Sequence, residues 1–267
     1  MARARRRDLV RLAGSVPRWR HSIDLGGGVV TEGSVAVGDL SRRWAELGLG
    51  DLRGRTVLDV GAGDGFFAFA AEEAGATRVV ALEHRWWATD PVVRERYLAT
   101  CRARGVAPHP GAGGEGWDPD GLPGKAGFDV VHRARASRVE AVVADFMTVD
   151  LDWLGPFDVV LFLDELNAVR HPLLALERVA AVTGEVACLS AEAVAVPGFE
   201  HHGFTEFFET GELGGDGSGW WAPNLRALET MCRAAGFGRV ACHDPVRARA
   251  PAPDALHRYE AVLTAWR

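Results

Sequence analysis

The sequence has few cysteines, and they are scattered. The four cysteines form no CxxC or CxxH pair, so neither a zinc site nor a disulfide framework is indicated. The acidic residues also lack the spacing that builds an octahedral oxygen site, and we therefore expect no metal. Free thiols suit a reducing compartment, and we expect a cytoplasmic protein. The cysteines are Cys101, Cys188, Cys232 and Cys242.

Long apolar runs are also missing. No uninterrupted segment approaches the ~18 apolar residues that span a bilayer, and residues 1–20 lack the apolar core of a secretory signal. Hydrophobic residues make up 48% of the chain and charged residues 25%, as in ordinary globular proteins. We therefore expect a soluble protein with one substantial core in its 267 residues.

An overall excess of basic charge is absent as well. The net charge of −6 argues against a surface that neutralises many phosphates. Residues 1–20 are the exception, with seven arginines and one aspartate. This segment is interpreted either as an amphipathic helix with a solvated basic face or as an RNA-binding arm. A nucleic-acid partner is therefore not expected but stays open through this segment, and the sequence does not indicate the oligomeric state.

Short apolar runs alternate with helical patterns through the middle of the chain. The runs are rich in β-branched residues, as expected of strands covered on both faces. Strands that alternate with helices imply right-handed crossovers and a mainly parallel sheet, which gives an α/β fold class. The predicted strands are 56–60, 78–82, 139–144, 157–163 and 186–190, and the predicted helices are 66–75, 90–104 and 172–182.

Two later segments have a different character. A helix over 223–235 ends at Gly236, and strands near 238–243 and 257–265 predict a closing hairpin. Residues 105–125 hold seven glycines and four prolines, a composition that sustains neither a helix nor a central strand. We interpret 105–125 as an exposed flexible loop, and both a plain insertion and a lid beside a ligand cleft stay open.

A glycine-rich turn follows the first predicted strand of this alternation. It reads Gly61-Ala62-Gly63-Asp64-Gly65-Phe66, which is G-x-G-x-G and not the dinucleotide fingerprint G-x-G-x-x-G. A dinucleotide needs its pyrophosphate on a helix N-terminus, whereas S-adenosylmethionine (SAM) has no phosphate and needs close approach of backbone. Glycine permits that approach because it has no Cβ.

Acidic residues stand at the ends of three successive strands in the order that a SAM site requires. Asp59 is the last residue but one of the first strand, Glu83 follows the second at the place where a carboxylate accepts from ribose hydroxyls, and Asp145-Phe146 suits the amine and ring of adenine. This order predicts a SAM cofactor. The expected cofactor-binding residues on these strand ends are Asp59, Gly61, Ala62, Gly63, Gly65, Glu83, His84, Asp145, Phe146 and Leu163.

The glycine turn and the stretches 19–33, 127–180 and 215–237 resemble class I SAM-dependent methyltransferases. The resemblance is to a subgroup similar to tRNA wobble-uridine (5-oxyacetic acid) methyltransferases and their small-molecule relatives. It implies a Rossmann-like, seven-stranded, mainly parallel sheet with the last strand antiparallel. It also implies an N-terminal helical cap segment over 1–45, with Trp19 and His21 at the cofactor, and a SAM-binding domain over 46–267.

The chain departs from this subgroup after the strand 157–163. Members commonly show Gly-Val-Leu-Tyr-His there, whereas this chain has Asp164-Glu165-Leu166-Asn167-Ala168, and the long N-terminal domain of the tRNA enzymes is missing. We therefore expect methyl transfer to an N, O or C atom of a small molecule in secondary metabolism, with S-adenosylhomocysteine (SAH) as product. The alternatives are SAM cyclisation or aminocarboxypropyl transfer, which release methylthioadenosine, and a tRNA-modifying enzyme.

The departing residues are the candidates for catalysis. Asp164, Glu165 and Asn167 follow a central strand at its carboxyl end, where ligands bind in open α/β sheets. A carboxylate there suits a substrate ammonium or a general base, although adjacent residues point oppositely and Asp164 could instead cap the next helix. Loop histidines and paired tryptophans are further candidates, with solvation and core packing as the alternatives. The expected substrate-binding residues are His171, His202, Trp220 and Trp221.

Overall fold

The computed structural model describes residues 2–108, 114–209, 212–213, 215, 217–243 and 257–267, with the backbone alone at 2–5. The chain divides into two compact units, which we describe separately. The first unit is Met1–Arg104 with Ala112–Phe146, and the second is Gly105–Gly111 with Met147–Arg267. The described helices include none that is both long and apolar enough to cross a membrane. A domain boundary near residue 45 stays a prediction.

Three parallel strands form the centre of the first unit. β3 (Thr56–Val60) pairs with β4 (Arg78–Glu83), and β4 pairs with β5 (Glu140–Val143). β3 is buried along almost its whole length, because its side chains Val57, Leu58 and Val60 pack under the helices, whereas β5 is largely exposed. The carboxyl ends of the three strands therefore meet at one edge of the sheet.

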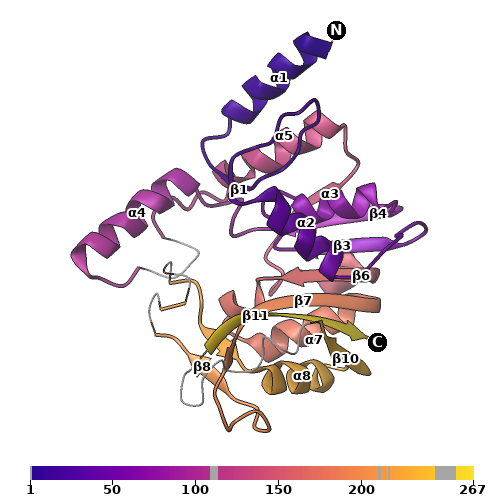
Figure 1. Cartoon of the computed structure of the whole chain (residues 1–267), viewed down its shortest axis with the longest axis vertical. Coiled ribbons are helices and arrows are strands. Elements are labelled where there is room, and N and C mark those ends of the chain that lie inside the picture. Colours follow the sequence, from indigo (N-terminus) through magenta and orange to yellow (C-terminus); the bar gives the residue numbers. More distant parts are fainter. Residues whose placement is uncertain (1, 109–113, 210–211, 214, 216, 244–256) are drawn as a thin grey trace. The chain divides into compact units, whose positions relative to one another are not determined.

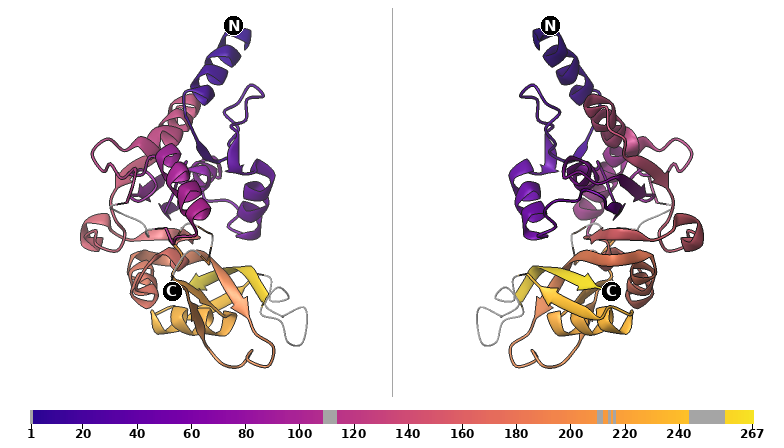
Figure 2. Two further views of the ribbon diagram at one scale, coloured as in Figure 1. Left: turned by 90° about the vertical axis from the view of Figure 1, so that its left-hand side faces the viewer. Right: turned by 90° about the vertical axis from the view of Figure 1, so that its right-hand side faces the viewer.

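Helices and a short N-terminal ribbon complete the first unit (Figure 1). The ribbon joins β1 and β2 in parallel. Figure 2 shows α1 extending away from the rest of this unit, and Leu9 is the buried apolar side chain of that helix while Val10 is 49% exposed. The elements are α1 (Ala2–Gly14), β1 (Trp19–His21), β2 (Gly33–Val35), α2 (Val37–Glu46), α3 (Phe66–Glu73), α4 (Pro91–Arg104), η1 (Pro123–Lys125) and α5 (Ala126–Arg135).

The second unit is built on a long antiparallel pair. β7 (Thr183–Ala195) pairs in parallel with β6 (Phe157–Leu163) and antiparallel with β11 (His257–Trp266), which also pairs antiparallel with β10 (Arg239–Cys242). Strand β11 thus runs opposite to both of its neighbours. The remaining elements are α6 (Leu151–Leu154), η2 (Leu166–Ala168), α7 (Pro172–Val182), β8 (Thr205–Phe207), β9 (Trp221–Pro223) and α8 (Leu225–Ala234).

The strand order confirms the expected fold class. The seven strands follow the order β10-β11-β7-β6-β3-β4-β5, mainly parallel with the last strand antiparallel. Strands β3 and β6 and helix α7 begin and end where the sequence predicts. β7 continues to Ala195, beyond the predicted 186–190, because its pairing with β11 extends from Val186 to Ala195.

Helix α5 has no counterpart among the predicted elements. Helix α5 follows the glycine-rich segment directly, and its residues Phe128, Val130 and Val131 are buried. Residues 114–125 of this segment are attached to the first unit, since the Asp118 amide donates to the Ala88 carbonyl at 2.7 Å. The part of this predicted loop at 109–113 lies outside the described residues.

Candidate functional site

The glycine turn continues β3 into α3 through left-handed backbone. Gly61, Gly63 and Gly65 have φ values of 79°, 55° and 88°, which side-chain-bearing residues rarely adopt. The Gly61 amide donates to the Leu82 carbonyl at 2.9 Å, which ties the turn to β4. A Cβ at Gly65 would lie 2.6 Å from the Phe69 ring. The turn therefore requires glycine for conformation and for close packing, and Ala62 is buried within it.

Glu83 ends β4 and turns its buried carboxylate onto the glycine turn. Its Oε2 accepts from the Gly63 amide at 3.2 Å, and its Oε1 accepts from the amides of His84 and Trp86, each at 2.9 Å. A carboxylate accepts about four hydrogen bonds, so Oε2 keeps acceptor capacity. The Glu83 carboxylate is therefore held in place by backbone and can still accept from a hydroxyl.

Asp64 joins the N-terminal ribbon to the turn, and the sequence reasoning missed it. Its Oδ2 accepts from the backbone amides of Arg20 at 2.7 Å and His21 at 3.0 Å. Burial raises the pKa of Asp64 to about 6, although the two amides oppose the rise. An aspartate inside a glycine-rich turn is the sequence signal that would have found it. This contact places His21 beside Gly63, since a Cβ at Gly63 would lie 3.3 Å from His21 Cε1.

Trp19 anchors the ribbon by its side chain. The indole Nε1 donates to the Ala13 carbonyl at 3.1 Å, and the ring packs against Gly127 of α5, where an added Cβ would lie 3.3 Å from Trp19 Cε3. The same Cβ would lie 2.5 Å from Asp64 Oδ1. Because Gly127 has no side chain, the space beside α5 is free for Trp19 and Asp64.

The remaining expected cofactor residues lie at different depths. In the first unit, Asp59 at the end of β3 is 2% exposed, Phe146 is buried, and Asp145 is exposed just past β5. His84 is half-buried with its ring edge on Trp117, the centroids 5.1 Å apart. Leu163 belongs to the second unit, where it is buried as the last residue of β6.

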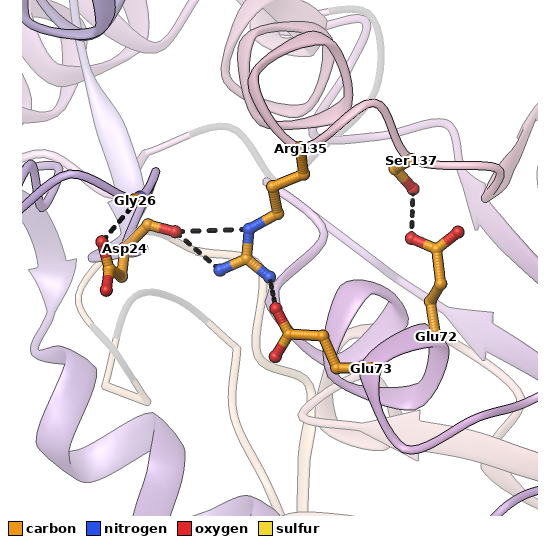
Figure 3. Close-up of polar contacts among 6 residues, drawn as sticks. All are labelled: Asp24, Gly26, Glu72, Glu73, Arg135 and Ser137. Atoms are coloured by element: carbon orange, nitrogen blue, oxygen red, sulfur yellow. Dashed lines mark hydrogen bonds and ion pairs between the residues drawn. The ribbon is translucent and has the colours of Figure 1, made fainter. Parts of the chain in front are cut away.

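An arginine of α5 fixes the loop between β1 and β2. Figure 3 shows Arg135 donating to the Asp24 carbonyl, at 3.2 Å from Nε and 2.7 Å from Nη2, while it pairs with Glu73 of α3. Beside it, Glu72 accepts from the Ser137 hydroxyl at 2.6 Å. These contacts hold the loop after β1 on the two helices that flank the glycine turn.

In the second unit, Asp164 stands directly after β6 with strained backbone. Its φ of 62° lies in the left-handed region, which residues other than glycine rarely adopt. Such conformations cluster at functional sites. The Ser190 hydroxyl of β7 donates to Asp164 Oδ1 at 2.8 Å, and the Asp164 amide lies 3.1 Å from both the carbonyl and the hydroxyl oxygen of Ser190. Half-buried Glu165, and not Asp164, occupies the N-cap position of η2.

Asn167 holds η2 to two strands of the second unit. Its Nδ2 donates to the carbonyls of Glu192 at 2.8 Å and Trp221 at 2.6 Å, and its Oδ1 accepts from the Glu192 amide at 2.9 Å. Each hydrogen of the amide group is therefore used within the protein. This geometry gives Asn167 the means to position the backbone of Glu192.

Glu192 adds a further carboxylate near that of Asp164, and the sequence reasoning missed it. Glu192 of β7 is exposed and lies opposite Glu260 in the β7–β11 register. Partial burial of its carboxyl group raises the pKa of Glu192, the carboxylates of Asp164 and Glu260 add to the rise, and Arg258 opposes it. Nothing in the sequence marks Glu192, because only strand pairing brings it to this group.

The expected substrate-binding residues divide into exposed histidines and half-buried tryptophans. His171 occupies the N-cap position of α7 without a side-chain capping hydrogen bond, and both His171 and His202 are exposed. Trp221 packs on exposed Phe207 at 4.8 Å between centroids, and its Nε1 is buried without a hydrogen-bond partner among the described residues. Trp220 has the Arg170 guanidinium over its ring at 4.7 Å. The two tryptophans therefore combine packing with accessible aromatic surface.

Within the described parts of the chain, no cluster of three or more His, Cys, Asp or Glu side chains could hold a metal ion. No family model matches the chain, and no curated protein matches it.

Solved structures do resemble the chain. The N-terminal domain of EvdMO1 with SAH bound gives a TM-score of 0.58 at 19% identity, covering 98% of this chain and 96% of that one. The same domain in the presence of SAH and D-fucose gives 0.57 at 19% identity, with the same coverage. Against the longer EvdMO1 chain, the TM-score is 0.57 at 20% identity, covering 98% of this chain and 47% of that one.

The chain thus spans about half the length of the longer EvdMO1 chain. A looser likeness, with a TM-score of 0.47 at 17% identity, is to 1,6-didemethyltoxoflavin-N1-methyltransferase of Burkholderia thailandensis, covering 85% of this chain and 76% of that one. The strand order and the likeness to the EvdMO1 domain show that the chain has the Rossmann-like fold of class I methyltransferases.

Proposed function

We propose that this protein transfers the methyl group of SAM to an N, O or C nucleophile of a small molecule, in secondary metabolism, and releases SAH. The observation that carries the proposal is the turn Gly61–Gly65 with the Glu83 carboxylate bound to the Gly63 amide. The bound SAH in the EvdMO1 domain, which shares the fold, supports the same cofactor.

The first unit has hydrogen-bond acceptors that suit the hydroxyl and amine groups of SAM. Glu83 keeps acceptor capacity on Oε2 for a ribose hydroxyl, and exposed Asp145 beside buried Phe146 suits the adenine amine and ring. Asp59, buried near the turn, offers carboxyl oxygens as hydrogen-bond acceptors for the ammonium group of SAM. His21, held by Asp64, lies against the turn that would contact the methionine portion.

The second unit has groups that suit an acceptor. Three carboxylates lie near the carboxyl ends of β6 and β7, those of Asp164, Glu165 and Glu192. Trp220 and Trp221 lie beside Asn167, because the Trp220 amide donates to the Asn167 carbonyl and the Asn167 side chain donates to the Trp221 carbonyl. Carboxylates accept from hydroxyls and ammonium groups, and aromatic faces pack on flat or cationic ligands. In this proposal Asp164 and Glu165 are catalytic residues, and Asn167 positions Glu192.

SAM supplies an electrophilic methyl group on a sulfonium. The acceptor's lone pair forms the new bond to the methyl carbon while the carbon–sulfur bond breaks, and its electrons return to sulfur. The acceptor's proton passes to a carboxylate such as Asp164 or Glu165, and then to water. Alignment of the nucleophile supplies much of the rate, so a strong base is not required.

Calorimetry with SAH tests the cofactor assignment. We expect SAH binding by the wild-type protein, and an affinity at least about tenfold lower for Glu83→Gln, because the anionic acceptor is lost. Glu32→Gln is the matched control, since Glu32 is exposed in the same unit, and its affinity should match that of the wild type. Absence of SAH binding to the wild type, or equal affinity of both variants, would contradict the proposal.

Product analysis separates the proposed reaction from its alternatives. Incubation with SAM and a panel of amines and deoxyhexoses, with D-fucose first because the EvdMO1 domain was crystallised with it, should release SAH. Methylthioadenosine from SAM alone would instead indicate cyclisation or aminocarboxypropyl transfer. SAH release only with tRNA would place the chain with the tRNA-modifying enzymes.

A further inference from the structure

Arg20 of β1 is a half-buried arginine that lies against the glycine turn. A Cβ on Gly63 would lie 3.3 Å from Arg20 Cδ, so the aliphatic stem of Arg20 packs on the turn. The Arg20 backbone amide donates to Asp64 Oδ2 at 2.7 Å, which fixes the residue at this place. The first unit therefore carries a cation beside the turn that continues β3 into α3.

The ring of Trp86, just past β4, supports the guanidinium group. Arg20 Cζ lies over this ring, 5.5 Å from its centroid, within the ~6 Å at which cations are attracted to aromatic faces. Trp86 is itself held, because its backbone amide donates to Glu83 Oε1 at 2.9 Å. The guanidinium is therefore supported by the segment that follows Glu83, the residue proposed to accept from the ribose hydroxyls.

The protein balances the charge of Arg20 only in part. Burial raises the pKa of Asp64 to about 6, and the Trp86 indole and the Arg20 charge are among the groups that oppose this rise. Arg20 thus acts on the Asp64 carboxylate through its charge. Among the described residues, the Arg20 guanidinium has no hydrogen-bond or ion-pair partner. Its N–H donors are therefore open to a ligand.

SAM carries an anionic group, the carboxylate of its methionine portion. The groups proposed for the rest of SAM include Asp59, Glu83 and Asp145, which accept hydrogen bonds and cannot donate to a carboxylate when they are ionised. A guanidinium matches a carboxylate in charge and in planar shape, and the two form paired hydrogen bonds. Arg20 has the chemistry that this part of the cofactor needs.

We propose that Arg20 binds the methionine carboxylate of SAM and SAH, and that the site thereby selects ligands that carry this carboxylate. This inference rests on the proposed function, which supplies the cofactor. The Trp86 ring and the backbone hydrogen bond to Asp64 restrict Arg20 before the ligand binds. Less conformational entropy is then lost on binding than for a solvated arginine.

Calorimetry with SAH and with decarboxylated SAH, which has a hydrogen in place of the carboxylate, tests this assignment. Arg20→Gln should bind SAH at least about tenfold more weakly than the wild type, and decarboxylated SAH within about twofold, because only the charged hydrogen bonds are lost. Arg18→Gln is the matched control, since Arg18 is exposed just before β1 and pairs with Glu95 at 3.3 Å. It should bind both ligands like the wild type.

The two ligands keep the possible failures apart. Unchanged binding of SAH by Arg20→Gln, or an equal loss for both ligands, would overturn the role of Arg20 and leave the proposed function standing, provided that the wild type binds SAH. If the wild type binds neither ligand, the proposed function and this inference both fall.

Trp86→Leu gives a second readout, because it removes the ring that supports the guanidinium. It should weaken SAH binding about three- to tenfold and leave the binding of decarboxylated SAH unchanged. In the Arg20→Gln background the same substitution should cause no further loss, because the ring acts through the guanidinium. A loss of the same size in both backgrounds would contradict the coupling between Trp86 and Arg20.

Discussion

At the scale of single residues, the carboxylates of the first unit differ by how the backbone surrounds them. Glu83 accepts three backbone amides, and Asp64 accepts two. Burial still raises the pKa of Asp64 to about 6, because the two amides only partly replace the water that its charge loses. The free energy of unfolding therefore includes a contribution from Asp64 that depends on pH.

That cost predicts a pH-dependent stability. The pKa of Asp64 rises from 3.8 when unfolded to about 6 when folded, so the folded state binds more protons between these values. Stability from this group is complete below pH ~4 and decreases by on the order of 3 kcal/mol as the pH rises to ~6. Asp64→Asn should flatten this decrease, as measured by urea denaturation from pH 4 to pH 7.

Asp120→Asn is the control for this measurement, since Asp120 is exposed in the same unit. Its pH profile should follow that of the wild type. If Asp64→Asn shows the same pH profile as the wild type, the Asp64 carboxyl is not the group that titrates in this range.

At the scale of elements, α5 and the ribbon depend on one glycine. Gly127 is the second residue of α5, and Gly38 is the second residue of α2. A Cβ at Gly38 would meet nothing within 4 Å, whereas at Gly127 it would lie 2.5 Å from Asp64 Oδ1. The same glycine-to-alanine substitution can therefore be compared at two helix positions, in open space at Gly38 and in a packed contact at Gly127.

We expect Gly127→Ala to destabilise the protein by about 1–3 kcal/mol, because the methyl group forces Asp64 and Trp19 to shift. Gly38→Ala should be neutral or stabilising by up to ~1 kcal/mol, because alanine favours the helix. Urea denaturation of both variants checks this. A loss of stability in Gly38→Ala equal to that in Gly127→Ala would show that the helix, and not the contact with Asp64, is responsible.

At the scale of the whole molecule, the charge distribution bears on nucleic-acid partners. The chain carries a net charge of −6, and the side chains of Arg6, Arg7 and Arg11 on α1 are exposed. A local basic segment on an acidic protein supports non-specific contact with phosphates more readily than a specific complex.

We therefore expect tRNA to bind only non-specifically, with a Kd of about 10⁻⁴–10⁻⁶ M that weakens with salt. Fluorescence anisotropy between low and physiological salt checks this, with the triple variant Arg6→Gln, Arg7→Gln, Arg11→Gln beside the wild type. Nanomolar affinity at physiological salt that the triple variant loses would favour the RNA-binding interpretation.

The sequence itself determined the alternation of strands and helices and the place of the glycine turn, because short apolar runs and left-handed glycines are local signals. It also placed Glu83 at the end of the second strand of this alternation, whereas the contact of its carboxylate with the Gly63 amide comes from the structure. The closing hairpin of β10 and β11 was expected from the local pattern, and their antiparallel pairing confirms it. That the last strand also runs antiparallel to the rest of the sheet was expected from the resemblance to methyltransferases, and the pairing of β11 with β7 confirms it.

The tertiary structure decided which side chains meet. Only the fold brings Asp64 to the amides of Arg20 and His21, 44 and 43 residues away, and only strand register sets Glu192 opposite Glu260. Asn167, expected among the catalytic residues, uses its amide to hold Glu192 and Trp221. Local patterns specify elements because they depend on neighbouring residues, whereas contacts between distant residues depend on how the whole chain packs.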